Sequence, residues 1–183
     1  ADHFSDGEYG ALACYNAAVC YEENEDWTAA IGGYVRFLAD FPHHENGRGL
    51  WPQIASLYHE ELGDYEQAIE AYEAAFASAF ENAAGQPDAP LAEIRFRQGE
   101  CHEKLGQLDA ALQRYEAAAT GPATDPFRIA SLAQMGKILE ERGDWAGAIA
   151  AFERIVAADG KPEWTAMAQG RIEAIRNTTI AGS

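Results

Sequence analysis

Apolar and polar positions along the chain follow a pattern that occurs four times. It is seen in EDWTAAIGGYVRFL (25–38), GDYEQAIEAYEAAF (63–76), GQLDAALQRYEAAA (106–119) and GDWAGAIAAFERIV (143–156). Each stretch has a turn, then an aromatic residue or Leu, an Ala three residues on, and an aromatic residue four further. This spacing is typical of an amphipathic helix, and a second helix of similar pattern precedes each stretch. The pattern therefore predicts four consecutive pairs of helices.

The helix pairs form units of constant length. Units of 34 residues, aligned on the recurring Ala of the second helix, cover residues 11–44, 49–82, 92–125 and 129–162. A fixed period in this range is typical of a stacked helical array. We expect residues 1–10 to be a remnant or partial helix. We expect residues 163–183 to supply a capping helix and tail, because apolar residues recur on one face of EWTAMAQGRIEAIRN (163–177). The insertion 83–91 contains GQPDAP, which predicts a loop.

Capping and close-packing residues recur at equivalent places in the units. The predicted N-caps of the second helices are Asp26, Asp64 and Asp144. Glycines suited to a tight turn between the paired helices are Gly63, Gly106 and Gly143. Gly99 and Gly136 lie within the first helices, where Gly costs roughly 1 kcal/mol against Ala, so they predict close contact between paired helices. Large residues occupy the remaining inner places, and we expect Trp27 and Trp145 to be buried.

With these places aligned, the units resemble the tetratricopeptide repeat. The first unit, residues 11–44, matches best, with Tyr21, Trp27, Ala30, Tyr34 and Pro42 in the family's places. The resemblance implies an all-α, right-handed helical-repeat solenoid of about four helix pairs plus a C-terminal capping helix. The long period and the ending FLADFP are similar to bacterial repeats of this family. Three residues depart from the pattern, since His59 and His102 replace Tyr and Arg95 replaces an apolar residue.

The resemblance also implies a place and a kind of function. In this family the first helices line a concave groove that takes a protein or peptide partner. The corresponding positions here are Tyr15, Asn16, Val19, Glu22, Gln53, Leu57, Glu60, Phe96, Arg97, Glu100, Glu103, Gln134, Lys137 and Glu140.

Four of these positions, Glu22, Glu60, Glu103 and Glu140, are equivalent and predict a ladder of carboxylates. The ladder either selects a basic peptide or solvates the edge of the groove. Exposed ion pairs contribute about 0.2–1 kcal/mol each, so affinity needs apolar anchors as well. Tyr15, Leu57 and Phe96 either supply those anchors or pack between helices.

Charge narrows the choice of partner. The 183 residues carry a net charge of -17, which excludes a nucleic-acid partner and argues against direct membrane binding. A basic protein partner, plain solubility or a salt-adapted proteome each fit the acidity.

No chemistry beyond binding is expected. His43 and His44 are adjacent but lack a third ligand at fixed spacing, so no metal site is predicted. No catalytic or cofactor motif occurs, so we expect neither an enzyme nor a cofactor. The three cysteines, Cys14, Cys20 and Cys101, are interpreted as small buried thiols, which slightly favours the cytoplasm. The periplasm also fits if a leader was removed.

The sequence therefore predicts a non-catalytic scaffold or adaptor that binds a protein or peptide. Two alternatives stay open: self-assembly into a dimer or filament through the end repeats, and a regulatory domain of a larger protein.

Overall fold

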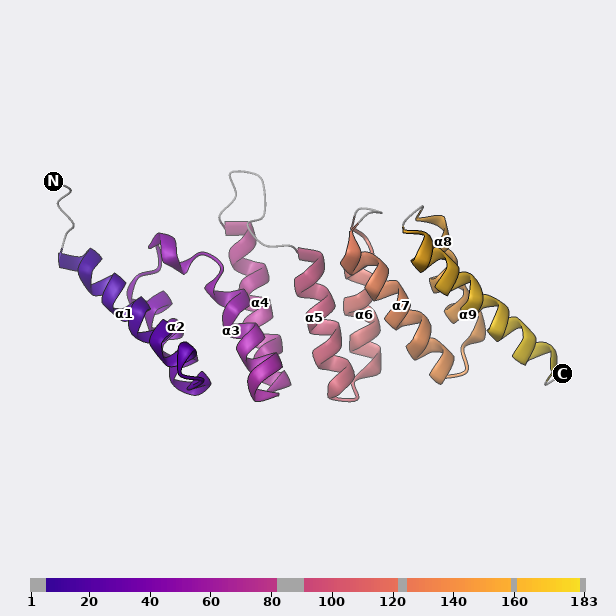
Figure 1. Ribbon diagram of the computed structural model, residues 1–183, viewed down its shortest axis with the longest axis horizontal. Helices are drawn as coiled ribbons and strands as arrows, with labels where there is room; N and C mark the ends of the chain where they lie inside the picture. Colours follow the sequence, from indigo (N-terminus) through magenta and orange to yellow (C-terminus); the bar gives the residue numbers. More distant parts are fainter. Residues whose placement is uncertain (1–5, 82–90, 122–124, 159–160, 182–183) are drawn as a thin grey trace. The chain divides into compact units, whose positions relative to one another are not determined.

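The computed structural model describes residues 6–81, 91–121, 125–158 and 161–181. These residues form helices joined by turns, with no strand in the described part of the chain, which confirms the all-α fold class. The chain divides into two compact units, residues 1–89 and 90–183, and each is considered by itself (Figure 1). The predicted loop at 83–91 falls almost entirely outside the described residues.

The first unit contains two helix pairs. Helices α1 (Asp6–Glu23) and α2 (Trp27–Asp40) pack against each other and form the first pair. A short 3₁₀ helix, η1 (Glu45–Gly47), precedes the second pair. In that pair α3 (Leu50–Ser56) continues directly into a π-helical turn, η2 (Leu57–Leu62), and both pack on α4 (Tyr65–Glu81).

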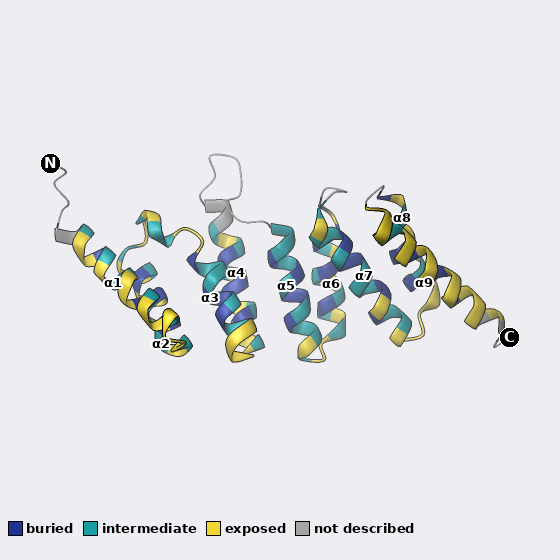
Figure 2. Ribbon diagram, in the orientation of Figure 1, coloured by how far each residue is buried: buried dark blue, intermediate teal, exposed yellow. Residues whose placement is uncertain are grey.

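The second unit contains two further pairs and one additional helix. Helix α5 (Leu91–Lys104) packs on α6 (Leu108–Ala118), and α7 (Pro126–Glu141) packs on α8 (Trp145–Ala157). Helix α9 (Pro162–Ala181) packs on α8. In each unit the buried residues lie where neighbouring helices face each other (Figure 2).

The predicted N-caps are confirmed. The carboxylate of Asp26 accepts a hydrogen bond from the backbone N–H of Ala29 at 3.2 Å. Asp64 and Asp144 accept in the same way, three residues on, at 3.2 Å and 2.9 Å. Each bond satisfies an N–H group that has no partner within its helix, so the second helices begin where the sequence predicts.

The turns within the pairs adopt the left-handed backbone conformation. The predicted turn glycines Gly63, Gly106 and Gly143 have φ of 63°, 72° and 73°. In the first pair Glu25 takes the same conformation, with φ of 60°. A residue with a Cβ atom is strained there, at about 1–2 kcal/mol, so the first turn is less favourable than the other three.

The predicted close contact between paired helices is also confirmed. A Cβ atom built on Gly99 would lie 2.5 Å from the ring of Tyr115, and one built on Gly136 would lie 2.5 Å from the ring of Phe152. The absence of a side chain lets the buried aromatic ring of the second helix lie directly on the first helix. Glycine at these places is therefore required by packing.

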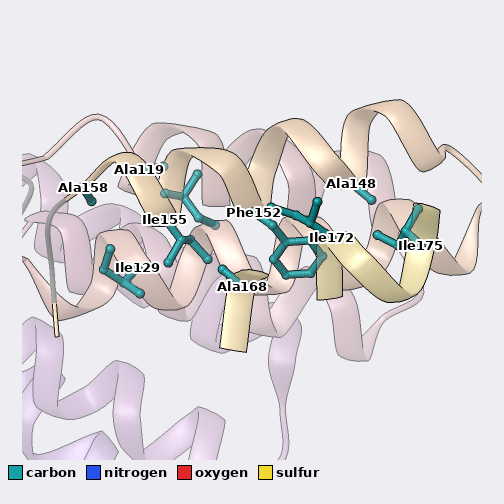
Figure 3. Packing of buried hydrophobic residues seen from close by; sticks show 10 residues of the cluster. Ala119, Ile129, Ala148, Phe152, Ile155, Ala158, Ala168, Ile172 and Ile175 are labelled. Carbon is teal, nitrogen blue, oxygen red and sulfur yellow. The ribbon is translucent and has the colours of Figure 1, made fainter. Parts of the chain in front are cut away.

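The core of the second unit explains the position of α9. Ala168, Ile172 and Ile175 of α9 are buried against a cluster that includes Phe152 and Ile155 of α8 (Figure 3). Trp164 packs against the same cluster. The apolar face predicted for this helix is confirmed, and it covers the α7–α8 pair.

Two expectations about burial are wrong. Trp145 is 40% exposed, because it is the first residue of α8 and lies at the turn between the paired helices. Its counterpart Trp27 also begins its helix and is half-buried. Of the three cysteines, Cys101 is buried, Cys14 is half-buried and Cys20 is exposed. The exposure of Cys20 on α1 thus differs from the expected burial.

Candidate functional site

The predicted partner-binding positions are divided between the two units. In the first unit they lie on α1 (Tyr15, Asn16, Val19, Glu22), on α3 (Gln53) and on η2 (Leu57, Glu60). In the second unit they lie on α5 (Phe96, Arg97, Glu100, Glu103) and on α7 (Gln134, Lys137, Glu140). Within each unit, hydrogen bonds or ion pairs join the neighbouring first helices, so each unit presents a continuous part of the predicted surface.

In the first unit the half-buried carboxylate of Glu22 joins three helices. The hydroxyl of Tyr34 on α2 donates a hydrogen bond to it, and the Nε2 amide of Gln53 on α3 donates a second at 2.6 Å. The same amide also lies 3.3 Å from the Tyr34 hydroxyl oxygen. Burial, and then the hydrogen bond to Glu22, raise the pKa of Tyr34 well above its ordinary value. Both donors are neutral, so they hold the carboxylate in place without cancelling its charge.

In the second unit Glu103 occupies the equivalent place with different partners. The hydroxyl of buried Tyr115 on α6 donates a hydrogen bond to its carboxylate at 2.9 Å. The ammonium of Lys137 on α7 lies 3.5 Å from the other carboxylate oxygen. Burial, and then the Glu103 charge, raise the pKa of Tyr115 well above its ordinary value. Here a cation faces the carboxylate, so the charge of Glu103 is partly compensated within the protein.

The other two glutamates of the predicted ladder differ again. Glu140 on α7 forms an ion pair with Arg171 of α9, and Phe152 stands where the other pairs have a tyrosine. Glu60 is exposed, whereas its three counterparts are half-buried. Glu60 lies in the π-helical turn η2, whose wider winding changes the direction in which its residues project. The four residues are equivalent in sequence but occupy four different environments.

Arg97 is surrounded by acidic groups on its own helix. Its guanidinium lies 3.1 Å from the carboxylate of Glu100 and 4.0 Å from that of Glu93. All three side chains are partly exposed, at 32%, 25% and 37% in the order Arg97, Glu100, Glu93. The group leaves one excess negative charge on the surface of α5.

The apolar positions are more deeply placed than the polar ones. Leu57 and Phe96 are buried, at 6% and 8% exposure. Tyr15 is half-buried and packs its ring against Phe37 at 5.6 Å, and Val19 is half-buried as well. Of the polar positions, Asn16 and Lys137 are exposed and Gln134 is half-buried.

Three residues that hold this surface together were not predicted. Tyr34 and Tyr115 were expected as packing residues, but their hydroxyl groups also orient the glutamates. The relevant pattern was present in the sequence, since Glu and Tyr are 12 residues apart in both pairs. Arg171 was missed because its helix was expected only to cover the last pair through apolar contacts.

Two other kinds of site, one for a metal ion and one for a membrane, have no candidate among the described residues. In residues 6–81, 91–121, 125–158 and 161–181, no group of three or more His, Cys, Asp or Glu could hold a metal ion. Among the helices described, none has the length and apolar character needed to cross a membrane.

Comparisons with known proteins agree with this geometry. One family model described as tetratricopeptide repeat matches residues 49–121, and a second matches residues 13–44 and 130–159. Among solved structures, the chain is similar to that of BtubC (BKLC) from P. vanneervenii, with a TM-score of 0.62 and 15% sequence identity. The match covers 96% of this chain and 85% of that chain, and at this identity it shows the fold alone, a helical-repeat solenoid. No curated protein sequence matches the chain.

Proposed function

This chain belongs to the tetratricopeptide repeat family, and we propose from that premise that it is a scaffold or adaptor that binds a basic segment of another protein. Tetratricopeptide repeats generally mediate protein–protein interaction and are typically non-catalytic. In each unit, the proposed binding surface is the face formed by the first helices of its repeats. The bacterial origin that the FLADFP ending suggests stays a prediction.

One observation carries the preference for a basic partner. Glu22 is held by two neutral donors, Tyr34 and Gln53, so its orientation is fixed and its charge is retained. Glu60 adds a second, exposed carboxylate in the same unit. None of the predicted positions of this unit is a cation, whereas those of the second unit include Arg97 and Lys137. The first unit therefore attracts a Lys or Arg side chain more strongly than the second.

The magnitude of this attraction requires additional contacts. Exposed ion pairs contribute about 0.2–1 kcal/mol each, so two carboxylates alone bind a peptide only weakly. The half-buried ring of Tyr15 and side chain of Val19 lie on the same helix as Glu22 and supply apolar contact area. A partner that places a basic residue beside an apolar one would use both.

The test compares two matched pairs of substitutions. A library of basic and neutral peptides is titrated against the wild type, the double variant Glu22→Gln/Glu60→Gln, and the control Glu103→Gln/Glu140→Gln. Glutamine retains a carbonyl oxygen for the Tyr34 hydroxyl, so the fold is preserved, and circular dichroism checks this. We expect the first variant to bind basic peptides about tenfold more weakly than the wild type. The control should lose less than half as much binding free energy.

Other results of the titration contradict the proposal in different ways. Equal losses in both variants would mean that the whole ladder attracts the partner without preference for the first unit. Unchanged binding in both variants would make the glutamates solvating groups. If none of the basic peptides binds the wild type, the proposal of a basic segment is wrong.

Self-assembly is a second candidate, and it is favoured by one observation. A largely apolar groove of about 700 Å³ runs between α8 and α9, with Val156 and Ile172 in its lining. Ile180, also in the lining, is 74% exposed. A second copy of the chain that covered this groove would remove this apolar surface from water. Light scattering after size exclusion, from micromolar to millimolar protein, tests self-assembly. A monomer throughout this range of concentration would rule it out.

A further inference from the structure

A cavity of the first unit lies apart from the surface proposed above. It has a volume of about 500 Å³ and is formed by α2, the segment 42–49, α3 and α4. The described residues that line it include Leu38, Pro42, His43, His44, Arg48 and Trp51. None of the partner-binding positions predicted from the sequence is among them. The cavity therefore needs an explanation of its own.

The charge of this lining is unusual for the protein. The chain has 30 Asp and Glu against 13 Lys and Arg, yet no acidic residue is among the described lining residues. Arg48 carries a positive charge on the lining, and His43 and His44 are beside it. Glu45 follows His44 in the chain but does not line the cavity. This is a cation-bearing cavity on a strongly acidic protein.

Arg48 differs from most other cations of the chain in its contacts. Arg36, Arg142 and Arg154 each form an ion pair with a carboxylate, at 3.3 Å, 2.6 Å and 2.6 Å. The structure gives the guanidinium of Arg48 no such pair with any described residue. Since no described carboxylate pairs with it, the guanidinium of Arg48 can offer N–H donors to a ligand.

The segment that carries these groups has a defined backbone. The N–H of His44 donates to the carbonyl of Phe41 at 3.1 Å, and the N–H of Arg48 donates to the carbonyl of Glu45 at 3.1 Å. The Nδ1 atom of His44 accepts from the N–H of Asn46 at 3.2 Å. A neutral His44 ring must therefore carry its proton on Nε2, which makes that atom a hydrogen-bond donor. The ring also packs edge-on against Phe37 at 5.4 Å, which fixes its orientation.

Apart from Ser78 and two glycines, the remainder of the lining is apolar or aromatic. Trp51 on α3 is half-buried and lines the cavity, as do Val35 and Leu38 of α2. Pro42, which precedes the two histidines in the chain, also lines the cavity. A ligand that fills the cavity thus meets donors and positive charge at one part and an apolar wall at another.

From this combination we infer that the cavity binds a small organic oxyanion, a carboxylate or phosphate group joined to an apolar or aromatic body. The guanidinium of Arg48 pairs with the oxyanion, and the Nε2–H of His44 donates a hydrogen bond to it. The body of the ligand packs against Trp51. Guanidinium groups suit this role because their planar arrangement of N–H donors matches two oxygens of a carboxylate or phosphate.

The experiment uses phenyl phosphate and benzoate as probes, each titrated by calorimetry. In parallel, the indole N–H resonance of Trp51, assigned with Trp51→Phe, is followed by NMR. Inorganic phosphate tests whether the anion alone is sufficient, and benzyl alcohol tests whether the apolar body alone is sufficient. We expect phenyl phosphate or benzoate to bind and to shift the Trp51 resonance, and both partial probes to bind at least tenfold more weakly.

Substitutions then identify the site. Arg48→Gln should weaken binding about tenfold, the loss expected for a charge-assisted hydrogen bond. Arg36→Gln is the matched control, since it removes an exposed arginine of the same unit that lies outside the cavity and pairs with Asp40. A third variant, Ala39→Met, leaves the charges intact and narrows the cavity from an exposed position on α2, so it should also weaken binding.

Several results would overturn the inference. Absence of binding by both organic probes at millimolar concentration would do so, as would equal losses in Arg48→Gln and Arg36→Gln. Binding of inorganic phosphate as tight as that of phenyl phosphate would show that the apolar wall takes no part. Binding unchanged by Ala39→Met would place the ligand outside the cavity.

Discussion

The pair α1–α2 and the pair α5–α6 are built to one plan and differ at two places. In both, a glutamate near the end of the first helix accepts a hydrogen bond from a buried tyrosine 12 residues on. In the first pair the next donor is the neutral amide of Gln53, and in the second it is the ammonium of Lys137. The turn between α1 and α2 has Glu25 in the left-handed conformation, whereas the turn between α5 and α6 has Gly106.

This comparison separates what the repeat needs from what it leaves free. The tyrosine and the glutamate are common to both pairs, so we interpret their hydrogen bond as part of the packing of the repeat. The further partner of each glutamate, Gln53 for Glu22 and Lys137 for Glu103, decides how much negative charge remains uncompensated on the surface. Equivalent glutamates therefore differ in their capacity to attract a basic ligand, and a count of acidic residues does not reveal this difference.

The largest expected effect comes from removing the tyrosine rings. Tyr34→Ala and Tyr115→Ala should each lower the free energy of unfolding by about 3–5 kcal/mol, because both rings are fully buried. Urea unfolding followed by circular dichroism measures the loss. If one of the two variants lost less than about 1 kcal/mol, the two pairs would not share the same packing plan.

Removing only the hydroxyl groups should have a smaller effect that differs between the pairs. Tyr34→Phe should cost about 1.5–3 kcal/mol, the range for a hydrogen bond to a charged group. Tyr115→Phe should cost less, because Lys137 continues to compensate Glu103. The same urea titrations measure both values, and a larger loss for Tyr115→Phe would contradict the interpretation.

The tyrosines also predict a dependence of stability on alkaline pH. Burial raises the pKa of both hydroxyl groups above the ordinary value, so the unfolded chain loses these protons first, near pH 10. The free energy of unfolding should therefore fall as pH rises above about 10, towards the folded-state pKa values. Burial raises the pKa of the Cys101 thiol to about 12, which adds a loss that begins at lower pH, near the ordinary value for cysteine. Tyr34→Phe and Tyr115→Phe should each flatten the alkaline part of the stability curve.

The turn provides a change of about 1 kcal/mol in the opposite direction. Glu25→Gly should stabilise the α1–α2 pair, because it relieves the strain of a residue with a Cβ atom in the left-handed conformation. The greater conformational entropy that glycine gives the unfolded chain offsets part of this gain. Gly106→Ala is the reciprocal change and should destabilise the α5–α6 pair. Thermal melts compare the two, and a lower melting temperature for Glu25→Gly would show that the Glu25 side chain contributes more than its backbone costs.

The smallest effect on stability should come from exchanging Gln53 and Lys137, the further partners of Glu22 and Glu103. Gln53→Lys and Lys137→Gln should each change the free energy of unfolding by less than about 1 kcal/mol, the usual range for partly exposed ion pairs. Their effect on ligand binding should be larger, since Gln53→Lys neutralises Glu22 and Lys137→Gln releases the charge of Glu103. Titration with a basic peptide should therefore show weaker binding for the first variant and stronger binding for the second. Identical binding by the two variants would mean that charge at these places does not select the partner.

Much of the fold was predictable because it depends on local properties of the sequence. Asp26 caps a helix through the backbone three residues on, and Gly143 adopts a conformation that glycine favours in any context. Gly99 and Gly136 predicted close contact because a mid-helix glycine is costly unless packing requires it. Recurrence of these features in more than one unit made the prediction stronger than any single unit would have allowed.

The environment of the candidate site was not predictable in the same way. The partners of Glu22, Glu103 and Glu140 come from other helices. The exposure of Trp145 and Cys20 and the π-helical turn at Glu60 were not predicted either. The spacing of 12 residues between glutamate and tyrosine was visible in the sequence, but not the third helix that completes each group.

The sequence by itself determined the helices, their pairing and the family, because hydrophobic period, capping and turn conformation act over a few residues and repeat. Only the tertiary structure decided which glutamates have a cation beside them. Such compensation depends on distances of a few ångströms between side chains that are far apart in the chain. The cavity beside Arg48 arises in the same way, from α2, α3 and α4 together.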